Sequence, residues 1–465
     1  MDPRPLSFIA AATGGELRAG SPNAQVEGVS TDSRQVARGD LFVALPGTKF
    51  DGHEFVAAAF REGAAAALVA RGRLSGPLAG GALIAVDDTR RALGRLAARY
   101  REDFTLPVIA VAGSNGKTTT KELLAAVLRQ RFSTVSSEAS FNNDIGVPLT
   151  LLRLKSTHDV AVLEAGTNHP GELAHLLGLI RPRYGALTCI GREHLEFFGD
   201  LEGVAQEEGC LADSLPANGL LFANGDDPWT AVVARRARAA VVRVGLSEAN
   251  DWRAHDLRLD QQGVSFRVQC PRAALVGEFR VHLLGRHQVV NALLALAIGA
   301  ELGLDRGELE RGLAECRPAK RRLEVWELKG VSVLDDAYNA NADSMVAALQ
   351  TLRDLPCKGR RVAVLGDMAE LGAHSVAAHE EVGRRAAELG VGQLFAVGKM
   401  APCLARGARG AGLNRVLEFA DVDGAAAALK LFLKEGDLLL LKASRASRLE
   451  RIADQLRASE GVKTN

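Results

Sequence analysis

The chain has 465 residues, which exceeds the size of one ordinary domain and predicts about two to four of them. Its 57 basic and 56 acidic residues leave a formal net charge of +1, so there is no electrostatic case for nucleic acid or an anionic membrane as a partner. The six cysteines are scattered without a Cys-x-x-Cys pair, which argues against a zinc site or a disulfide framework and indicates reduced thiols.

The N-terminal part predicts a small α/β unit. Residues 1–5 lack the apolar core of a signal peptide, and Arg61 and Glu62 interrupt the alanine-rich run at 56–70, so this run is unable to span a bilayer. We therefore expect a cytoplasmic protein without membrane insertion. Short strands surround one strong helix near 53–65, and the segment 88–100 predicts a capped helix that connects to the next unit.

Residues 107–120 carry the most informative motif. The apolar run 108–112 predicts a buried strand and 121–128 a helix, with a glycine turn and a Gly-Lys-Thr string between them. Backbone N–H groups of such a turn bind phosphate oxygens, the lysine neutralises their charge, and the first threonine can ligate Mg²⁺. A tight turn with a solvated lysine is the alternative, but the strand–turn–helix context favours a triphosphate site. The predicted ATP-binding residues here are Gly113, Ser114, Asn115, Gly116, Lys117, Thr118 and Thr119.

A strand–helix alternation follows this loop and predicts a largely parallel sheet covered by helices. Glu164 ends a buried strand, where an NTPase places its metal-binding acid and where an unpaired structural glutamate would be costly. His194 lies just beyond the next strand. We expect further strands at 160–164, 186–190 and 220–224, antiparallel edge strands at 258–268 and 279–284, and helices at 291–302 and 305–316.

A second α/β alternation begins after the basic segment 317–322, which is a plausible hinge. Its strands are expected at 332–335, 361–365, 394–397, 416–419 and 438–441. The predicted architecture is therefore α/β with three domains, at 1–100, 101–316 and 317–465. The central one is a P-loop ATPase domain with a parallel sheet, and the last one is Rossmann-like.

Together these motifs resemble the Mur ligases, the ATP-dependent amide-forming enzymes of peptidoglycan precursor synthesis. The phosphate loop is similar to that family's shortened P-loop, which lacks the first glycine of the general motif; Val111 stands there in this chain. Glu164 and His194 fall on the family's two metal-ligand motifs. The segment 285–291 resembles the part that holds the adenine ring, with His287 and Asn291 as candidate contacts, although the family usually has Asn at Gln288.

Other segments are similar to one branch of this family. The segments 30–34, 42–47 and 51–53 resemble the N-terminal domain that takes the UDP end of the substrate. The segments 141–148, 335–341 and 366–372 resemble the last ligase of the series, which joins D-alanyl-D-alanine to UDP-N-acetylmuramoyl-tripeptide. The resemblance implies these two substrates as partners, ATP and Mg²⁺ as cofactors, and a monomer. The implied substrate residues are Thr31, Asp32, Ser33, Arg34, Asn142, Asn143, Tyr338, Asn339, Asn341 and Ser344.

The resemblance also implies a two-step mechanism through an acyl phosphate. Lys117 would offset phosphate charge, Arg322 would reach the γ-phosphate after domain closure, and Asp336 would contact the nucleotide. The string 442–445 is similar to a C-terminal family motif that either contacts substrate or is merely solvated. Asn142 and Asn143 could likewise cap a turn instead of holding substrate.

One departure from the family concerns the metal. The family usually carries a lysine shortly after the His194 motif, and CO₂ converts it to a carbamate that helps bind a second Mg²⁺. Here Glu208 takes that position, and no lysine occurs from 156 to 319. We expect Glu208 to supply the carboxylate directly, so the metal ligands would be Thr118, Glu164, His194 and Glu208. The alternative is that Glu207 and Glu208 form a solvated acidic pair.

Two rival functions remain open on the sequence. One is a sister ligase on the same fold, either another Mur ligase or a folylpolyglutamate-type enzyme, against which the string 335–341 argues. The other is a P-loop protein that uses ATP as a conformational switch, which leaves the N-terminal segments and the third unit unexplained.

Overall fold

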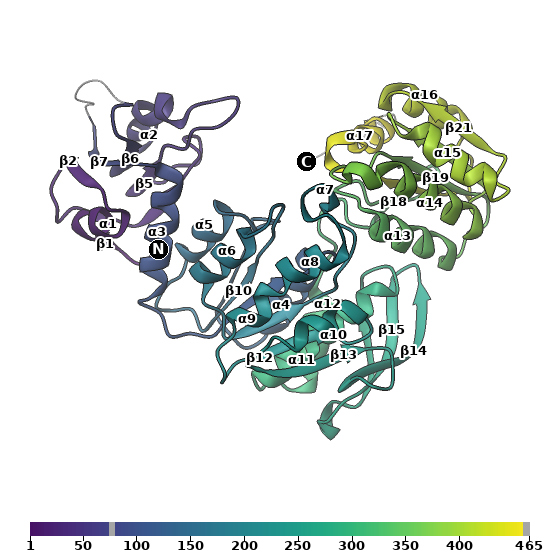
Figure 1. The fold of residues 1–465 in the computed structure, drawn as a ribbon, viewed down its shortest axis with the longest axis horizontal. Coiled ribbons are helices and arrows are strands. Elements are labelled where there is room, and N and C mark those ends of the chain that lie inside the picture. The colour runs from purple at the N-terminus through teal and green to yellow at the C-terminus, as the bar shows by residue number, and fades with distance from the viewer. Residues whose placement is uncertain (74–79, 459–465) are drawn as a thin grey trace.

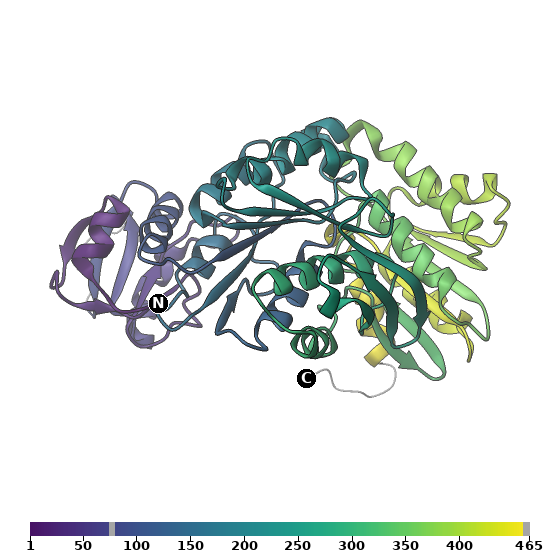
Figure 2. The same ribbon diagram turned by 90° about the horizontal axis from the view of Figure 1, so that it is seen from below.

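The computed structural model describes residues 1–73 and 80–458, which form three α/β domains, each around its own main sheet. Figure 1 shows them in an arc, with the N-terminal domain at one end, the central domain in the middle and the C-terminal domain at the other end. The view from below in Figure 2 places the central sheet between the two outer domains. The predicted α/β fold class with three domains is confirmed.

The N-terminal domain has a five-stranded sheet in the order β2-β7-β6-β5-β4, in which only β2 is antiparallel to its neighbour. The predicted helix at 53–65 is shorter than expected, because it starts as a 3-10 turn and ends at Gly63, which has a φ of +110°. The capped helix is confirmed, since Asp88 accepts hydrogen bonds from two backbone N–H groups of α3. The main elements are α1 (Leu6–Thr13), β2 (Glu16–Ala19), β4 (Gly28–Ser30), β5 (Asp40–Val43), α2 (Val56–Glu62), β6 (Ala66–Ala70), β7 (Ala82–Val86) and α3 (Thr89–Arg101).

The central sheet has nine strands in the order β16-β15-β14-β13-β12-β11-β8-β10-β9, parallel from β9 to β14 and antiparallel at the β14–β15–β16 edge. Its strands are β8 (Val108–Ala112), β9 (Thr134–Ser136), β10 (Val160–Glu164), β11 (Tyr184–Leu187), β12 (Leu220–Asn224), β13 (Ala240–Gly245), β14 (Trp252–Asp260), β15 (Gly263–Gln269) and β16 (Gly277–Val281). Its helices are α4 (Lys117–Leu128), α5 (Gly146–Leu151), α6 (Glu172–Ile180), α7 (Leu195–Phe198), α8 (Leu201–Glu208), α9 (Cys210–Ser214), α10 (Pro228–Ala234), α11 (His287–Glu301) and α12 (Arg306–Glu315).

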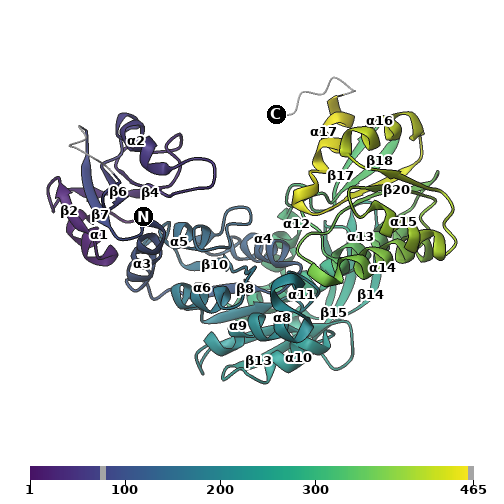
Figure 3. The same cartoon turned by 45° about the horizontal axis from the view of Figure 1, so that its top comes forward.

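Strand β8 is apolar throughout because both faces of the sheet are covered. Ile109 and Val111 pack in the cluster that includes α4, α11 and α12, whereas Val108 and Ala110 pack in the cluster on the opposite face with α6 and α9. Figure 3 shows helices on both sides of this sheet. Two-sided burial explains the unbroken apolar runs, and it brings the ends of β8 and β10 side by side.

Four predicted boundaries in the central domain are wrong. The strand expected at 279–284 is β16, which starts at Gly277 and ends at Val281. The expected strand 186–190 is β11, which starts at Tyr184 and ends at Leu187. The expected strand 258–268 is the end of β14, a turn and most of β15, because the alternating pattern continues across the turn of the hairpin. Helix α11 begins at His287, four residues earlier than expected, so the 285–291 segment forms its first turn.

The C-terminal sheet has six strands in the order β17-β18-β22-β19-β20-β21, all parallel except the edge strand β17, which the sequence did not predict. Its strands are β17 (Glu324–Leu328), β18 (Val331–Asp335), β19 (Arg361–Gly366), β20 (Gln393–Val397), β21 (Val416–Phe419) and β22 (Leu438–Lys442). Its helices are α13 (Ala342–Asp354), α14 (Ser375–Glu388), α15 (Ala401–Gly410), α16 (Val422–Phe432) and α17 (Glu450–Ala458). All six cysteines of the chain are free. Among the helices that the structure describes, none combines the length and apolar character needed to cross a bilayer.

Candidate active site

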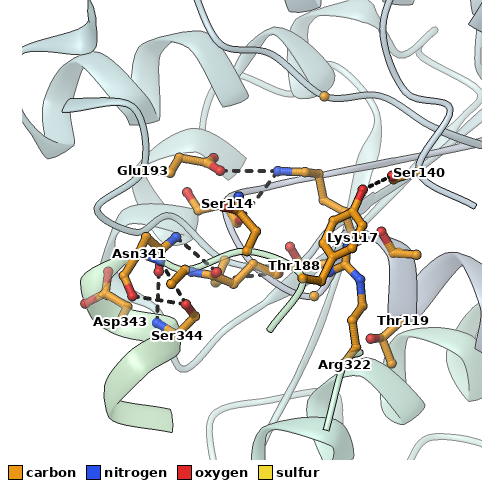
Figure 4. A pocket seen from close by; sticks show the side chains of 18 of the residues that line it. Ser114, Lys117, Thr119, Ser140, Thr188, Glu193, Arg322, Asn341, Asp343 and Ser344 are labelled. Carbon is orange, nitrogen blue, oxygen red and sulfur yellow. Dashed lines mark hydrogen bonds and ion pairs between the residues drawn. The ribbon is translucent and has the colours of Figure 1, made fainter. Parts of the chain in front are cut away.

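One cavity of about 570 Å³ lies where the carboxyl ends of the central strands face the C-terminal domain. Figure 4 shows side chains from both domains pointing into it. Eighteen of the predicted site residues line this cavity, which brings together segments far apart in the chain. They are Ser114, Asn115, Gly116, Lys117, Thr118, Thr119, Asn142, Asn143, Glu164, His194, His287, Asn291, Arg322, Asp336, Tyr338, Asn339, Asn341 and Ser344.

The phosphate loop needs its glycines for both conformation and space. Gly113 and Gly116 have φ angles of +116° and +86°, in the left-handed region that glycine adopts without strain. A Cβ on Gly113 would lie 2.3 Å from Thr188 Oγ1, and one on Gly116 would lie 2.7 Å from Asn291 Oδ1. The loop is therefore held against β11 on one side and α11 on the other, with its backbone facing the cavity.

Lys117 is folded back onto its own loop. Its Nζ donates to the carbonyl oxygens of Gly113 at 2.5 Å and Ser114 at 3.3 Å, and lies 3.3 Å from Glu193 Oε2. Figure 4 shows Lys117 and Glu193 facing each other at the edge of the cavity. Burial alone would lower the pKa of Lys117, but the surrounding acids, Glu193 above all, raise it, so the side chain keeps its positive charge.

Four buried oxygen atoms around this lysine have no hydrogen-bond partner within the described residues: Thr118 Oγ1, Glu164 Oε2, Glu193 Oε1 and Glu208 Oε1. Burying carboxylate oxygens without a donor is costly, so this set fits a cation that the protein does not itself supply. Across residues 1–73 and 80–458, no group of three or more His, Cys, Asp or Glu side chains is arranged so that it could hold a metal ion by itself. Magnesium suits such an incomplete set, because it takes one or two carboxylates and completes its shell with phosphates and water.

Glu208 lies beneath the phosphate loop and does not line the cavity. Its side chain is buried, and its Oε2 accepts a hydrogen bond from Gly113 N at 2.6 Å. Burial raises the pKa of Glu208, which Lys117 partly opposes. The neighbouring Glu207 is also buried and accepts hydrogen bonds from Thr167 Oγ1, Gly171 N and Leu173 N. The alternative of a solvated acidic pair at 207–208 is therefore wrong.

His194 occupies the N-cap of α7 in a left-handed conformation, with a φ of +49°. Its Nδ1 lies 2.5 Å from Oε2 of Glu370, which belongs to the C-terminal domain. Its Nε2 lies 4.0 Å from Glu193 Oε2. Glu370 of the C-terminal domain therefore holds His194, the predicted metal ligand, so that its ring faces the phosphate loop of the central domain.

The predicted adenine residues lie at the start of α11, behind the phosphate loop. Asn291 Oδ1 accepts from Thr120 Oγ1 at 3.2 Å, and its Nδ2 donates to Gln288 Oε1 at 2.9 Å. Gln288 also contacts the His287 ring at 3.1 Å. Burial lowers the pKa of His287 to about 4, so the ring is neutral at physiological pH.

Arg322 enters the cavity from the C-terminal side. Its guanidinium lies over the Tyr338 ring, 4.3 Å from the centroid, and Tyr338 OH hydrogen-bonds Ser140 Oγ of the central domain. In the described part of the chain no carboxylate pairs with this guanidinium. It is thus a cation available to an anionic ligand, stacked on an aromatic ring.

The other predicted residues of the C-terminal domain make hydrogen bonds within the protein. Asn341 Nδ2 donates to Asn115 Oδ1 of the phosphate loop at 3.0 Å, and Asn341 forms a capping box with Ser344. Asp336 Oδ2 accepts from Lys442 Nζ at 2.6 Å, and Lys442 also donates to the Asn339 carbonyl at 3.1 Å. Lys442 is buried and lines the cavity, so the alternative that the 442–445 string is merely solvated is wrong for this residue.

The loop between β9 and α5 brings two further predicted residues to the cavity. Asn142 Nδ2 donates to Glu164 Oε1 at 2.8 Å, which fixes one oxygen of that carboxylate. Asn143 Oδ1 accepts from Ile145 N and Gly146 N, so Asn143 caps the start of α5 while it lines the cavity.

The N-terminal candidates do not reach this cavity. Thr31, Asp32, Ser33 and Arg34 follow β4 in the outer domain, where Arg34 bonds Asp32 through Nε at 2.9 Å and Nη2 at 2.7 Å. Hydrogen bonds from Arg34 hold the pKa of Asp32 at about 2.

Sequence reasoning did not single out Glu193 and Glu370 as residues that contact the predicted site, and it left open whether Lys442 contacts substrate or is solvated. Glu193 could have been found, because it directly precedes His194. Glu370 and Lys442 lie in the segments 366–372 and 442–445 that resemble the family, but these segments do not reveal their partners, which are 176 and 106 positions away.

Comparison with known proteins identifies the family. Three family models match, the Mur ligase middle domain at residues 111–299, the Mur ligase glutamate ligase domain at 321–445 and the Mur ligase family catalytic domain at 25–101. The chain is also 38% identical over 459 residues to the UDP-N-acetylmuramoyl-tripeptide--D-alanyl-D-alanine ligase of Escherichia coli K12, which covers 97% of this chain and 98% of that protein. The chain belongs to the Mur ligase family.

Solved Mur ligase structures have the same fold over nearly the whole chain. A crystal structure of MurF from Acinetobacter baumannii has a TM-score of 0.87 at 32% identity and covers 98% of this Mur ligase and 99% of that chain. MurF from Thermotoga maritima, solved in complex with ADP, has a TM-score of 0.80 at 27% identity and covers 94% and 98%. The resemblance inferred from the motifs is confirmed.

Proposed function

We propose that this Mur ligase joins D-alanyl-D-alanine to UDP-N-acetylmuramoyl-tripeptide and converts ATP to ADP and phosphate. The observation that carries the proposal is the shared cavity, in which the phosphate loop of one domain faces Arg322 and Asn341 of another. A ligase needs such a site, because it must hold a triphosphate and an acceptor in one water-poor space. The near-full-length similarity to ligases of this specificity supports the choice of substrates.

The chemistry has two steps. A carboxylate oxygen of the tripeptide attacks the γ-phosphorus, the bond to ADP breaks, and an acyl phosphate forms. The amine of D-alanyl-D-alanine then attacks the carbonyl carbon, the carbon–oxygen bond to phosphate breaks, and the amine gives up a proton. Lys117 and Arg322 offset the charge on the transferred phosphoryl group. Docking of the C-terminal domain excludes water, which would otherwise hydrolyse the acyl phosphate.

Magnesium, when bound, neutralises charge on the β- and γ-phosphate oxygens. We assign its protein ligands to Thr118, Glu164, His194 and Glu208. Three of the four carry an unpartnered buried oxygen, and Glu193 offers a further one beside them. At the position where the family usually has a lysine that reacts with CO₂, Glu208 provides a carboxylate without that reaction. Its Oε2 accepts from Gly113, whereas its Oε1 has no hydrogen-bond partner among the described residues and is open to a metal ion or to a water in its shell.

The substrates are assigned to different parts of the arc. ATP binds the loop 113–119 and the start of α11, with His287 and Asn291 near the adenine and Asp336 on the C-terminal side. Residues 31–34 hold the UDP end in a domain spanning 1–100, while Asn142, Asn143, Tyr338, Asn339, Asn341 and Ser344 contact the peptide parts.

We assign the central domain to 101–316 and the C-terminal domain to 317–465. A monomer suffices, because one chain supplies both halves of the cavity, and cytoplasmic ATP and UDP-linked substrate imply a cytoplasmic enzyme.

Phosphate release from ATP tests the proposal, with each substrate added singly and together. Release that requires both the UDP-tripeptide and D-alanyl-D-alanine is the expected result. Release without either substrate would instead support a nucleotide switch. Equal release with a single amino acid in place of the dipeptide would support a sister ligase. Mass measurement of the product, heavier than the tripeptide by one dipeptide less water, identifies the new amide.

A further inference from the structure

The segment 367–374 of the C-terminal domain docks on helix α7 of the central domain by three hydrogen bonds. The Glu370 carbonyl accepts from Glu196 N at 3.0 Å, and His374 Nε2 contacts the Gly199 carbonyl at 2.8 Å. The third bond joins Glu370 Oε2 and His194 Nδ1. The left-handed φ of Glu370, +60°, turns both its side chain and its carbonyl onto α7. The segment is thus placed to act on His194 whenever the two domains are docked.

The bond to Glu370 determines which nitrogen of His194 is free. A carboxylate only accepts hydrogen bonds, so Nδ1 must carry the hydrogen. In the neutral ring the lone pair then lies on Nε2, which is the form that ligates a metal. Nε2 has no hydrogen bond among the described residues and faces Glu193 at 4.0 Å, on the side of Lys117. A ring without Glu370 would be free to take either tautomer and to rotate about its side-chain bonds.

We propose that Glu370 is a positioning residue that directs His194 Nε2 to the Mg²⁺ of the nucleotide, so that metal affinity depends on the docking of the C-terminal domain. This inference rests on the proposed role of His194 as a metal ligand. Carboxylates that hold a ligating histidine in this way typically affect metal affinity by about 10–100-fold. Because coupling between two binding events is reciprocal, bound metal also favours the docked arrangement.

The test uses the full chain with Mn²⁺ and a non-hydrolysable ATP analogue. Pulsed EPR detects the ¹⁴N modulation of an imidazole bound to Mn²⁺, and His194→Gln identifies which modulation comes from His194. We expect Glu370→Ala to reduce this modulation and to weaken Mn²⁺ binding to the complex about tenfold. Glu370→Gln keeps an acceptor for Nδ1, so it should retain more of the modulation than Glu370→Ala.

Glu381→Ala provides the matched control, because Glu381 also joins the domains, through Arg192 Nη1 at 2.6 Å, but touches no proposed ligand. It should leave the modulation and the Mn²⁺ affinity within about twofold of the wild type. Undiminished modulation in Glu370→Ala would overturn the proposal, and so would an equal loss in both variants, which would point to docking alone. Wild-type modulation that survives His194→Gln would instead refute His194 as a ligand. Thermal unfolding checks that each variant is folded.

Discussion

Gly113 and Glu208 are 95 positions apart, yet the backbone N–H of Gly113 donates to Glu208 Oε2 at 2.6 Å in a fully buried contact. The first glycine of the phosphate loop is therefore fixed by the C-terminal end of α8. The other carboxylate oxygen of Glu208 has no partner among the described residues. The Glu208 side chain thus contacts the phosphate loop through Oε2, while its Oε1 belongs to the group of oxygens assigned to magnesium.

The first prediction concerns carbon dioxide. If Glu208 supplies the carboxylate that relatives obtain by lysine carbamylation, wild-type activity is the same in CO₂-depleted and bicarbonate-containing buffer. Glu208→Lys should be weakly active without CO₂ and gain activity as bicarbonate is added. Glu208→Ala should lose about 100-fold in kcat and need more Mg²⁺. The measurement is phosphate release against Mg²⁺ concentration.

Glu207→Gln is the matched control for this series. Among the described residues, Glu207 bonds to Thr167 in the loop before α6 and to backbone N–H groups at the start of α6, so the variant should lower thermal stability without changing the Mg²⁺ dependence. Strong bicarbonate dependence of the wild type, or a normal Mg²⁺ dependence of Glu208→Ala, would contradict the assigned role of Glu208.

The second prediction concerns Lys121, a fully buried lysine on α4. Its Nζ donates to the carbonyls of Ser137 at 2.8 Å and Ala139 at 2.7 Å, and pairs with Glu122 at 2.6 Å. Lys121→Met leaves these groups unpaired, which should lower the free energy of unfolding by about 3 kcal/mol. The loop that carries Asn142 would lose its support, so KM for the UDP-tripeptide should rise about tenfold.

Denaturant unfolding and steady-state kinetics check this second prediction. Arg129→Met is the control, because Arg129 bonds the end of β9, through Ser136 Oγ at 2.9 Å, and among the described residues makes no hydrogen bond to the backbone at 137–139. Arg129→Met should change the free energy of unfolding and the KM for the UDP-tripeptide by much less than Lys121→Met does. An unchanged KM in Lys121→Met would show that the loop keeps its shape without the lysine.

The third prediction separates the hydrogen bond of Tyr338 to Ser140 from the contact of its ring with Arg322. Tyr338→Phe removes the hydrogen bond to Ser140 but keeps the ring under Arg322, whereas Tyr338→Leu removes both. A cation–aromatic contact contributes about 1–2 kcal/mol where water is excluded, so Tyr338→Leu should lower kcat about tenfold more than Tyr338→Phe. Single-turnover phosphate release measures the difference, and equal losses in both variants would assign the effect to the hydrogen bond.

The fourth prediction concerns pH. The pKa of His287 is lowered to about 4 in the folded protein, so between pH 6.5 and 4 the unfolded chain binds more protons than the native one. Stability should therefore fall as pH drops through this window, with His287 accounting for about 2 kcal/mol of the loss between pH 7.5 and 5. In His287→Gln the fall should be smaller by that amount. Urea unfolding at several pH values measures it, and exposed His175→Gln should keep the wild-type slope.

Much of the central sheet could be predicted from sequence, because burial on both faces leaves apolar runs that end in turns. Strands β8, β10 and β12 have the predicted limits for this reason. The β14–β15 hairpin was missed because its alternation continues through the turn at 261–262, and β17 was missed because an edge strand with exposed residues lacks such a run.

Eighteen of the 37 residues that line the cavity were predicted, helped by the rule that the ends of neighbouring parallel strands meet at one edge of a sheet. The contacts between domains could not be predicted in the same way. The pairing of Arg192 with Asp343 and Glu381 depends on how two separate sheets dock, and no local pattern carries that information. Family resemblance supplied Arg322 and Asn341, whereas the contact of Glu370 with His194 required coordinates.

The hydrogen bond from Asn341 to Asn115 spans 226 positions and the boundary between two domains. A nucleotide that shifts the phosphate loop by even a small distance therefore pulls on the first turn of α13. In the same way, a rotation of the C-terminal domain pulls on the phosphate loop. Nucleotide binding and rotation of the C-terminal domain are therefore coupled through the hydrogen bond between Asn341 and Asn115.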